Sequence, residues 1–154
     1  MKKVVSMLVV LAMLLLCIPV FGSAVVSSAD TLPTDGYIDV TCAVTNTGDR
    51  DGDQVLQLYY HFSGAHVIRP NMQLIAFKRV HLEKGESKTV TFRLEASGLG
   101  YYNEEMIFGV EPGPAELKLG VSSAEIIDEK RIMLTGPAVD LMGKRSYVCR
   151  SEEK

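Results

Sequence analysis

Cysteine, histidine and excess basic charge are all scarce in this 154-residue chain, and each scarcity narrows the range of functions. Its three cysteines allow at most one intrachain disulfide. No two of its three histidines have the close spacing of a zinc site, so we treat all three as surface residues. The formal net charge of -3 removes the electrostatic basis for binding nucleic acid.

Motifs for catalysis or for holding a cofactor are also missing. No Ser/His/Asp or Cys/His arrangement stands out, and no glycine-rich phosphate loop leads from a strand into a helix. Asp49, Asp51 and Asp53 alternate as in a calcium loop, but Gln54 takes the place of its glycine and Tyr60 that of its final glutamate. We therefore expect no metal and no cofactor, and we interpret the aspartates as turn formers.

The N-terminal segment has the order of a secretory signal peptide. Lys2 and Lys3 open it, residues 4–21 are almost wholly apolar, and residues 22–29 are rich in small side chains. We expect residues 1–29 to be removed by cleavage after Ala29, with Ala24 as the alternative, which predicts a secreted protein. The apolar stretch approaches the ~18 residues of a spanning helix, so an uncleaved membrane anchor over residues 4–21 is a second reading.

Loss of this leader takes Cys17 away and leaves Cys42 and Cys149 in an oxidising compartment. Two interpretations stay open for them. One is a disulfide between Cys42 and Cys149. In the other, Cys42 is a buried free thiol, because it belongs to an inward-facing series of small apolar residues, while Cys149 lies in a polar segment.

Behind a short linker, residues 30–36, apolar and polar residues alternate with a period of two, and glycine or proline interrupts them every eight to fifteen residues. This pattern predicts seven strands that close an all-β sandwich over residues 37–136, followed by a flexible polar tail over residues 137–154. Pro70 should lie outside the sheets, since proline lacks the donor that a ladder needs. The predicted inward residues are Ile38, Val40, Cys42, Val44, Leu56, Leu58, Tyr60, Phe62, Leu74, Ala76, Val80, Leu82, Val90, Phe92, Leu94, Met106, Phe108, Val110, Leu117, Leu119 and Val121.

Several segments, taken together, resemble one known domain. They are Val44–Tyr59, Arg69-Pro70, Phe77–Val80, Lys84–Phe92, Tyr101–Asn103 and Val110–Gly113. In this order they resemble the fibronectin type III-like domain that ends many family 3 glycoside hydrolases, such as β-glucosidases and β-xylosidases. The resemblance covers roughly residues 37–134 and implies a seven-stranded, immunoglobulin-like sandwich. In those enzymes the catalytic carboxylates belong to a barrel domain and an α/β domain, which this sequence does not contain.

The resemblance therefore implies a packing role and no enzymatic activity. Glycoside hydrolysis needs two carboxyl groups facing each other ~5–9 Å apart, whereas Glu104 and Glu105 are adjacent and diverge in an extended chain. We expect a secreted accessory module that packs on a glycoside hydrolase catalytic domain or on another protein, with contact with a membrane only if the leader stays. Two alternatives are a detached fragment of a β-glucosidase-type hydrolase and a free-standing carbohydrate-binding domain, whose tyrosines would stack on sugar rings. The candidate contact residues are Tyr59, Arg69, Tyr101 and Tyr102.

Overall fold

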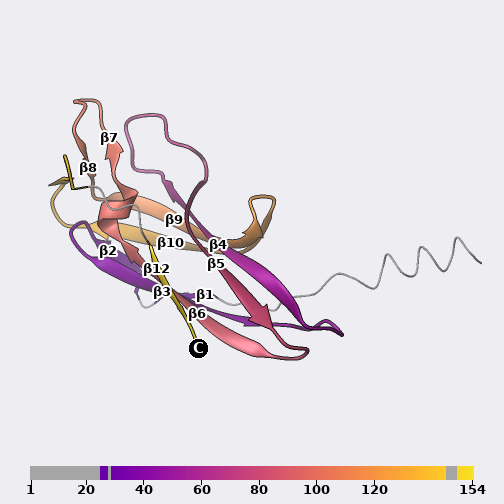
Figure 1. The fold of residues 1–154 in the computed structure, drawn as a ribbon. Helices are drawn as coiled ribbons and strands as arrows, with labels where there is room; N and C mark the ends of the chain where they lie inside the picture. The colour runs from indigo at the N-terminus through magenta and orange to yellow at the C-terminus, as the bar shows by residue number, and fades with distance from the viewer. Residues whose placement is uncertain (1–24, 28, 145–148) are drawn as a thin grey trace, which may run out of the picture.

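The computed structural model describes residues 25–27, 29–144 and 149–154. The segment 4–21, on which the signal-peptide and anchor predictions rest, lies outside this range, as does the rest of the expected leader up to residue 24. Within the described residues no helix is long and apolar enough to cross a bilayer. The chain forms two stacked β-sheets, with a small hairpin and a loop projecting from one end (Figure 1).

Strands make up almost all of the regular structure in the described residues. One sheet has the order β1-β3-β6-β12, a second the order β2-β10-β9-β4-β5, and a small third sheet the order β11-β8-β7. Neighbouring strands are antiparallel except for β2, which runs parallel to β10. The elements are β1 Val25–Ser27, β2 Thr31–Pro33, β3 Tyr37–Thr45, β4 Gly52–Phe62, β5 Gln73–Leu82, β6 Ser87–Glu95, the 3-10 turn η1 Ala96–Leu99, β7 Tyr101–Tyr102, β8 Phe108–Val110, β9 Gly113–Ser122, β10 Glu125–Thr135, β11 Val139–Asp140 and β12 Arg150–Glu153.

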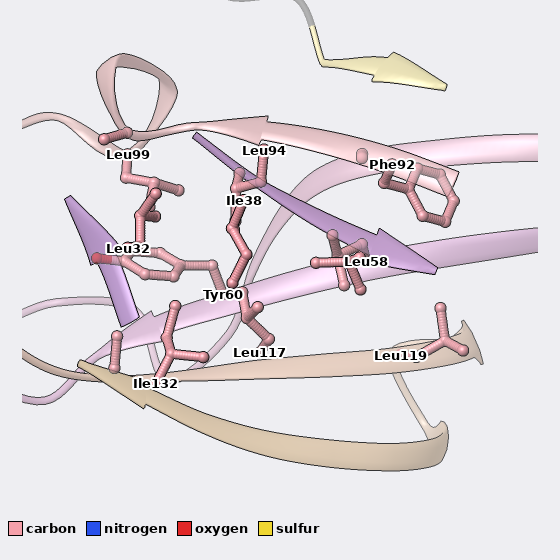
Figure 2. Packing of buried hydrophobic residues seen from close by; sticks show 14 of the residues in the cluster. Leu32, Ile38, Leu58, Tyr60, Phe92, Leu94, Leu99, Leu117, Leu119 and Ile132 are labelled. Carbon is pink, nitrogen blue, oxygen red and sulfur yellow. The ribbon is translucent and has the colours of Figure 1, made fainter. Parts of the chain in front are cut away.

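The core lies between the two large sheets, where the alternating apolar residues meet. Phe92 of β6, Leu58 of β4 and Leu119 of β9 are among its fully buried side chains, and Figure 2 shows them reaching into the same layer. The antiparallel register of β3 with β6 pairs Val40 with Phe92, so both strands turn their apolar faces inward. The all-β sandwich predicted from the sequence is confirmed, and β3, β4, β5, β6, β8, β9 and β10 are its seven predicted strands.

Two predicted inward residues face outward instead. Leu74 is 47% exposed because the ladder between β4 and β5 shifts register, pairing Leu58 with Ala76 but Tyr59 with Leu74. Ile75 is the extra residue of this bulge, and it packs against the core in place of Leu74. Met106 is 72% exposed because it lies at the tip of the β7–β8 hairpin with a φ of 61°.

The segments expected as linker and tail also contain strands. Residues 31–33 form β2, whose Leu32 is fully buried, so the interpretation of residues 30–36 as a plain linker was wrong. The described part of the polar tail forms β11 and β12, and Leu141 between them is buried. The expectation of a flexible tail was therefore wrong for these residues, because main-chain pairing orders a strand even when its side chains are polar.

Candidate docking surface

One end of the sandwich holds Arg69, Tyr101 and Tyr102, three of the four side chains that sequence reasoning singled out for contact. The hairpin of β7 and β8, the loop 63–72 and strand β11 meet there and enclose an open cavity of about 470 Å³. Acidic groups dominate its polar lining: Glu104, Glu105, Glu111 and Asp140 all contribute to it. Adjacent Glu104 and Glu105 are both exposed on the hairpin turn.

A partly buried hydrogen-bond network shapes the hairpin. The Tyr101 hydroxyl donates to one oxygen of the Glu111 carboxylate, and the Asn103 amide donates to the other at 3.2 Å. The Asn103 side-chain oxygen accepts from the backbone N–H groups of Glu105 and Ile107, each at 3.0 Å, which fixes the turn. Burial and then the bond to Glu111 raise the pKa of Tyr101, so its hydroxyl stays a donor at neutral pH.

Arg69 joins the loop 63–72 to this network. Its guanidinium carbon lies 4.7 Å from the centre of the Tyr101 ring, a cation–π contact, and Nη2 donates to the Gln73 side chain at 3.3 Å. Its Nε is buried without a hydrogen-bond partner. Arg69 therefore holds the loop 63–72 against Tyr101, and its guanidinium is directed towards the protein more than towards solvent.

Four exposed apolar side chains belong to the segments that line the cavity. Ile68 is fully exposed on the loop, and Tyr102, Met106 and Ile107 are exposed on the hairpin, with Tyr102 packed edge-on against Phe108 at 5.1 Å between ring centres. We call Ile68, Tyr102, Met106 and Ile107 the apolar rim, since each lies in the cavity lining or next to a residue that does. A cluster of exposed large apolar residues is typical of a protein interface.

The structure separates the four predicted contact residues. Tyr101 is buried beneath the rim, and Tyr59 is only 6% exposed, on the outer face of β4, where its hydroxyl donates to Gln57. Neither offers an open ring face for stacking on a sugar. Tyr102 is 53% exposed and belongs to the rim, and Arg69 lies over the ring of Tyr101. Sequence reasoning missed Ile68, Met106 and Ile107, although apolar residues beside turn signals were the available clue.

Of the two interpretations left open for the cysteines, the structure supports the free thiol: Cys42 is free and buried, Cys149 is free and partly buried, and the Cys42–Cys149 disulfide is absent. Cys42 lies opposite Val90 on one side of β6, while Cys149 lies on the other side, just before the residue paired with Arg93. Strand geometry puts their Cα atoms roughly 15 Å or more apart, far beyond the ~7 Å that a disulfide spans. Burial raises the pKa of both thiols to about 11, so neither is a ready nucleophile.

Two of the three aspartates that resembled a calcium loop, Asp51 and Asp53, have partners in other parts of the chain. Asp51 accepts from the backbone N–H of Lys84 at 2.8 Å, and Asp53 pairs with Arg79 and His81. The Arg79 hydrogen bond, followed by that of His81, lowers the pKa of Asp53. Among the described residues no group of three or more His, Cys, Asp or Glu side chains is placed to hold a metal.

Comparison with known proteins shows which domain family this sandwich belongs to. The family described as the fibronectin type III-like domain matches residues 54–123. The periplasmic β-glucosidase of Salmonella typhimurium is 38% identical over 104 residues, which is 68% of this chain and 14% of that enzyme. The chain carries a fibronectin type III-like domain of the family 3 β-glucosidase and β-xylosidase kind.

Further relatives agree with this assignment. A β-xylosidase of Formosa agariphila is 38% identical over 105 residues, covering 68% of this chain and 14% of the enzyme. The solved β-glucosidase of Erythrobacter marinus superposes with a TM-score of 0.70 at 34% identity, over 76% of this chain and 16% of that one. The fibronectin type III-like chain thus spans only about a seventh of the length of these enzymes.

Proposed function

We propose that this chain is a secreted, non-catalytic accessory module that packs on a glycoside hydrolase catalytic domain through its apolar rim. The exposed rim carries this proposal. Covering an isoleucine or methionine side chain stabilises a complex by up to roughly 1.5–3 kcal/mol, so four rim residues supply enough apolar contact to anchor a partner. The matched relatives are hydrolases in which this domain is a small part of the chain.

The backbone at Met106 adds a second argument. Its φ of 61° is in the left-handed region, which costs a side-chain-bearing residue about 1 kcal/mol, and glycine or asparagine would relieve it. The backbone N–H of Met106 closes the hairpin turn by donating to the Asn103 carbonyl at 3.0 Å, but its exposed side chain buries little area in the free domain. A contact made by its side chain in a complex accounts for it.

A chimeric enzyme tests the docking role. In it, residues 30–154 replace the corresponding domain of the Salmonella typhimurium β-glucosidase, and the thermal unfolding midpoint of the enzyme is measured. Met106→Asn should lower this midpoint by several degrees, while the free module keeps its stability because asparagine tolerates positive φ. The matched control is Phe77→Asn, which changes a similarly exposed apolar residue on the outer face of β5, 67% exposed against 72% for Met106. Equal effects of the two substitutions would contradict docking through the rim.

The non-catalytic part of the proposal has its own test. The purified chain should not hydrolyse aryl-glucosides or aryl-xylosides, because its acidic residues at the cavity lie on one turn and on neighbouring strands without a barrel to hold a sugar between them. Turnover that co-purifies with the chain through several columns, and disappears in a Glu104→Gln or Glu111→Gln variant, would overturn it.

Exposed Tyr102 supports a second candidate, a carbohydrate-binding domain. Its ring is half exposed, and its sequence neighbours Tyr101 and Asn103 line a cavity whose carboxylates could accept hydrogen bonds from sugar hydroxyls. Calorimetry against soluble β-glucans and xylans should then give saturable heat that Tyr102→Ala abolishes. The alternative of a detached hydrolase fragment is decided by the DNA upstream of Met1, where a frame encoding a barrel domain would support it.

A further inference from the structure

Strand β12 covers the outer edge of β6, the strand that would otherwise end the β1-β3-β6 sheet. The two strands are antiparallel and pair Arg150 with Arg93 through Glu153 with Val90. Thr89 and Lys154 extend the ladder with two reciprocal backbone hydrogen bonds of 2.8 and 2.9 Å. Figure 1 shows this last strand lying beside β6 near the C-terminus.

Main-chain hydrogen bonds to β6 hold β12 in place almost without help from its side chains. None of its four side chains is buried, and Ser151 is the only one that is not exposed. Cys149, just ahead of it, supplies an additional contact by donating from Sγ to the Arg93 carbonyl at 3.0 Å and packing against the core. A ladder of this kind can be made by any extended segment, so it selects weakly by sequence.

Two cationic side chains near the edge of β6, Lys78 and Arg93, favour an acidic segment there. The Glu153 carboxylate lies 3.6 Å from the Lys78 ammonium of the opposite sheet. The Arg93 guanidinium, held mainly by Asp39, is also stabilised in its charged form by the field of Glu152. Arg150 lies opposite Arg93 in the register, so the match in charge comes from the two adjacent carboxylates, Glu152 and Glu153, and not from the whole strand.

We propose that the outer edge of β6 is a strand-acceptor site, which β12 of the same chain closes and which β12 of a second copy enters when its own strand peels away. An uncovered edge strand is a template for pairing with another chain, and the segment that matches it in charge is the chain's own. The tether favours closure in the same molecule at low protein concentration, since it holds β12 at millimolar effective concentration. The chain would then have two contact surfaces on different parts of the sandwich: the apolar rim for a partner protein, and the edge of β6 for self-association.

Alternation along β6 supplies an internal control for detachment. Because Thr89 and Lys154 form a hydrogen-bonded pair, the N–H groups of Thr89, Thr91 and Arg93 point to β12, and those of Val90, Phe92 and Leu94 point to β3. Amide hydrogen exchange of the full chain should be at least about tenfold faster for the first set. Equal protection of the two sets would mean that β12 opens only with the whole sandwich, and the proposal would fail.

Two proline variants and one peptide test occupancy. By the same alternation the Glu152 N–H points to β6 and the Ser151 N–H points to solvent, so Glu152→Pro opens the edge and Ser151→Pro, the matched control, does not. An acetylated peptide with the sequence of residues 150–154 should shift the amide resonances of Thr89, Thr91 and Arg93 in the Glu152→Pro chain. Binding should be at least about tenfold tighter than to the unaltered chain or to Ser151→Pro.

A second experiment tests whether an intact second chain can supply the β12 strand that pairs with β6. Isotope-labelled Glu152→Pro chain mixed with unlabelled unaltered chain should show the same shifts on β6 as the peptide produces. Absence of peptide binding to Glu152→Pro overturns the acceptor site, and peptide binding without a response to the whole chain overturns the second copy as its occupant. Should Glu152→Pro fail to fold, Glu153→Lys, which reverses the charge facing Lys78, should speed exchange at Thr89, Thr91 and Arg93 alone; unchanged exchange there counts against the site.

Discussion

Asn46 is the buried polar residue whose replacement tests the turn architecture most directly. Its side chain is only 4% exposed, and Nδ2 donates to the carbonyl oxygens of Arg50 at 2.8 Å and Leu82 at 3.2 Å. Its Oδ1 accepts from the backbone N–H of Gly48 at 2.9 Å. One amide thus joins the β3–β4 turn to the end of β5, and water cannot easily replace it.

Asn46→Ala should lower the free energy of unfolding by about 2–4 kcal/mol. The estimate takes about 1 kcal/mol for each of three lost hydrogen bonds, with the buried Leu82 carbonyl left without this donor at the upper end. Asn46→Asp should cost more at neutral pH, because it places a negative charge against two carbonyl oxygens. The loss of stability in Asn46→Asp should shrink in acid, because a protonated carboxyl can again donate one hydrogen bond to a carbonyl oxygen.

Urea unfolding followed by circular dichroism measures both variants. The midpoint should fall at unchanged slope, and the melting temperature of Asn46→Ala should fall by roughly 10 °C. Asp49→Ala, in the same turn but exposed, is the control and should stay within about 0.5 kcal/mol of the unaltered chain. A loss below about 0.5 kcal/mol for Asn46→Ala would refute the view that this amide holds the two turns together.

Three further predictions follow from single contacts. Phe92→Ala should lower the unfolding free energy by about 3–5 kcal/mol in the same urea assay, since the ring is fully buried, whereas exposed Phe77→Ala should change it by less than about 0.5 kcal/mol. The Arg93 guanidinium beside Asp39 lowers the pKa of that carboxyl, so the pair stabilises the fold above the unfolded-state value near ~4 and this stability is lost as pH falls through the lower folded value. Asp39→Asn should therefore flatten the acid limb of stability against pH, and an unchanged limb would count against the pair. Burial raises the pKa of the Cys42 thiol to about 11, so iodoacetamide at pH 8 should label it only on unfolding, as mass spectrometry can follow.

The sandwich could be predicted from the sequence because two-residue alternation fixes which face of each strand is apolar. Val40 and Phe92 are buried as expected, and they pair with each other in the middle of the regular β3–β6 ladder. Leu74 could not be placed, because the bulge at Ile75 depends on how β4 pairs with β5 and leaves no local signature. Strand β12 was missed for a related reason, since its order comes from the free edge of β6 and not from its own polar residues.

The docking end was only half predictable. Adjacent tyrosines indicated a contact corner, but the sequence could not tell which ring turns inward. The Glu111 carboxylate and the Arg69 guanidinium decide this by drawing Tyr101 into the structure, which leaves Tyr102 outside. Both partners come from other segments of the chain, so the distinction arises from tertiary contacts.

The other edge of the four-stranded sheet leads to a last prediction, about processing of the N-terminus. Strand β1 covers the free edge of β3, pairing Val25 with Cys42 and Ser27 with Val40, much as β12 covers β6. Cleavage after Ala24 would keep this cover, whereas cleavage after Ala29 would remove it and leave β3 as an uncovered edge.

Two purified forms, one beginning at Val25 and one at Asp30, should therefore differ. The shorter form should self-associate at lower concentration in light scattering, because both its unpaired β3 backbone and the apolar face behind it become accessible when the edge frays. The Asp30–Lys130 ion pair, 2.8 Å long, is kept in both forms, so it cannot account for a difference. Identical association curves would show that β1 does not protect the sheet, and the choice between the two cleavage sites would then have no structural consequence at β3.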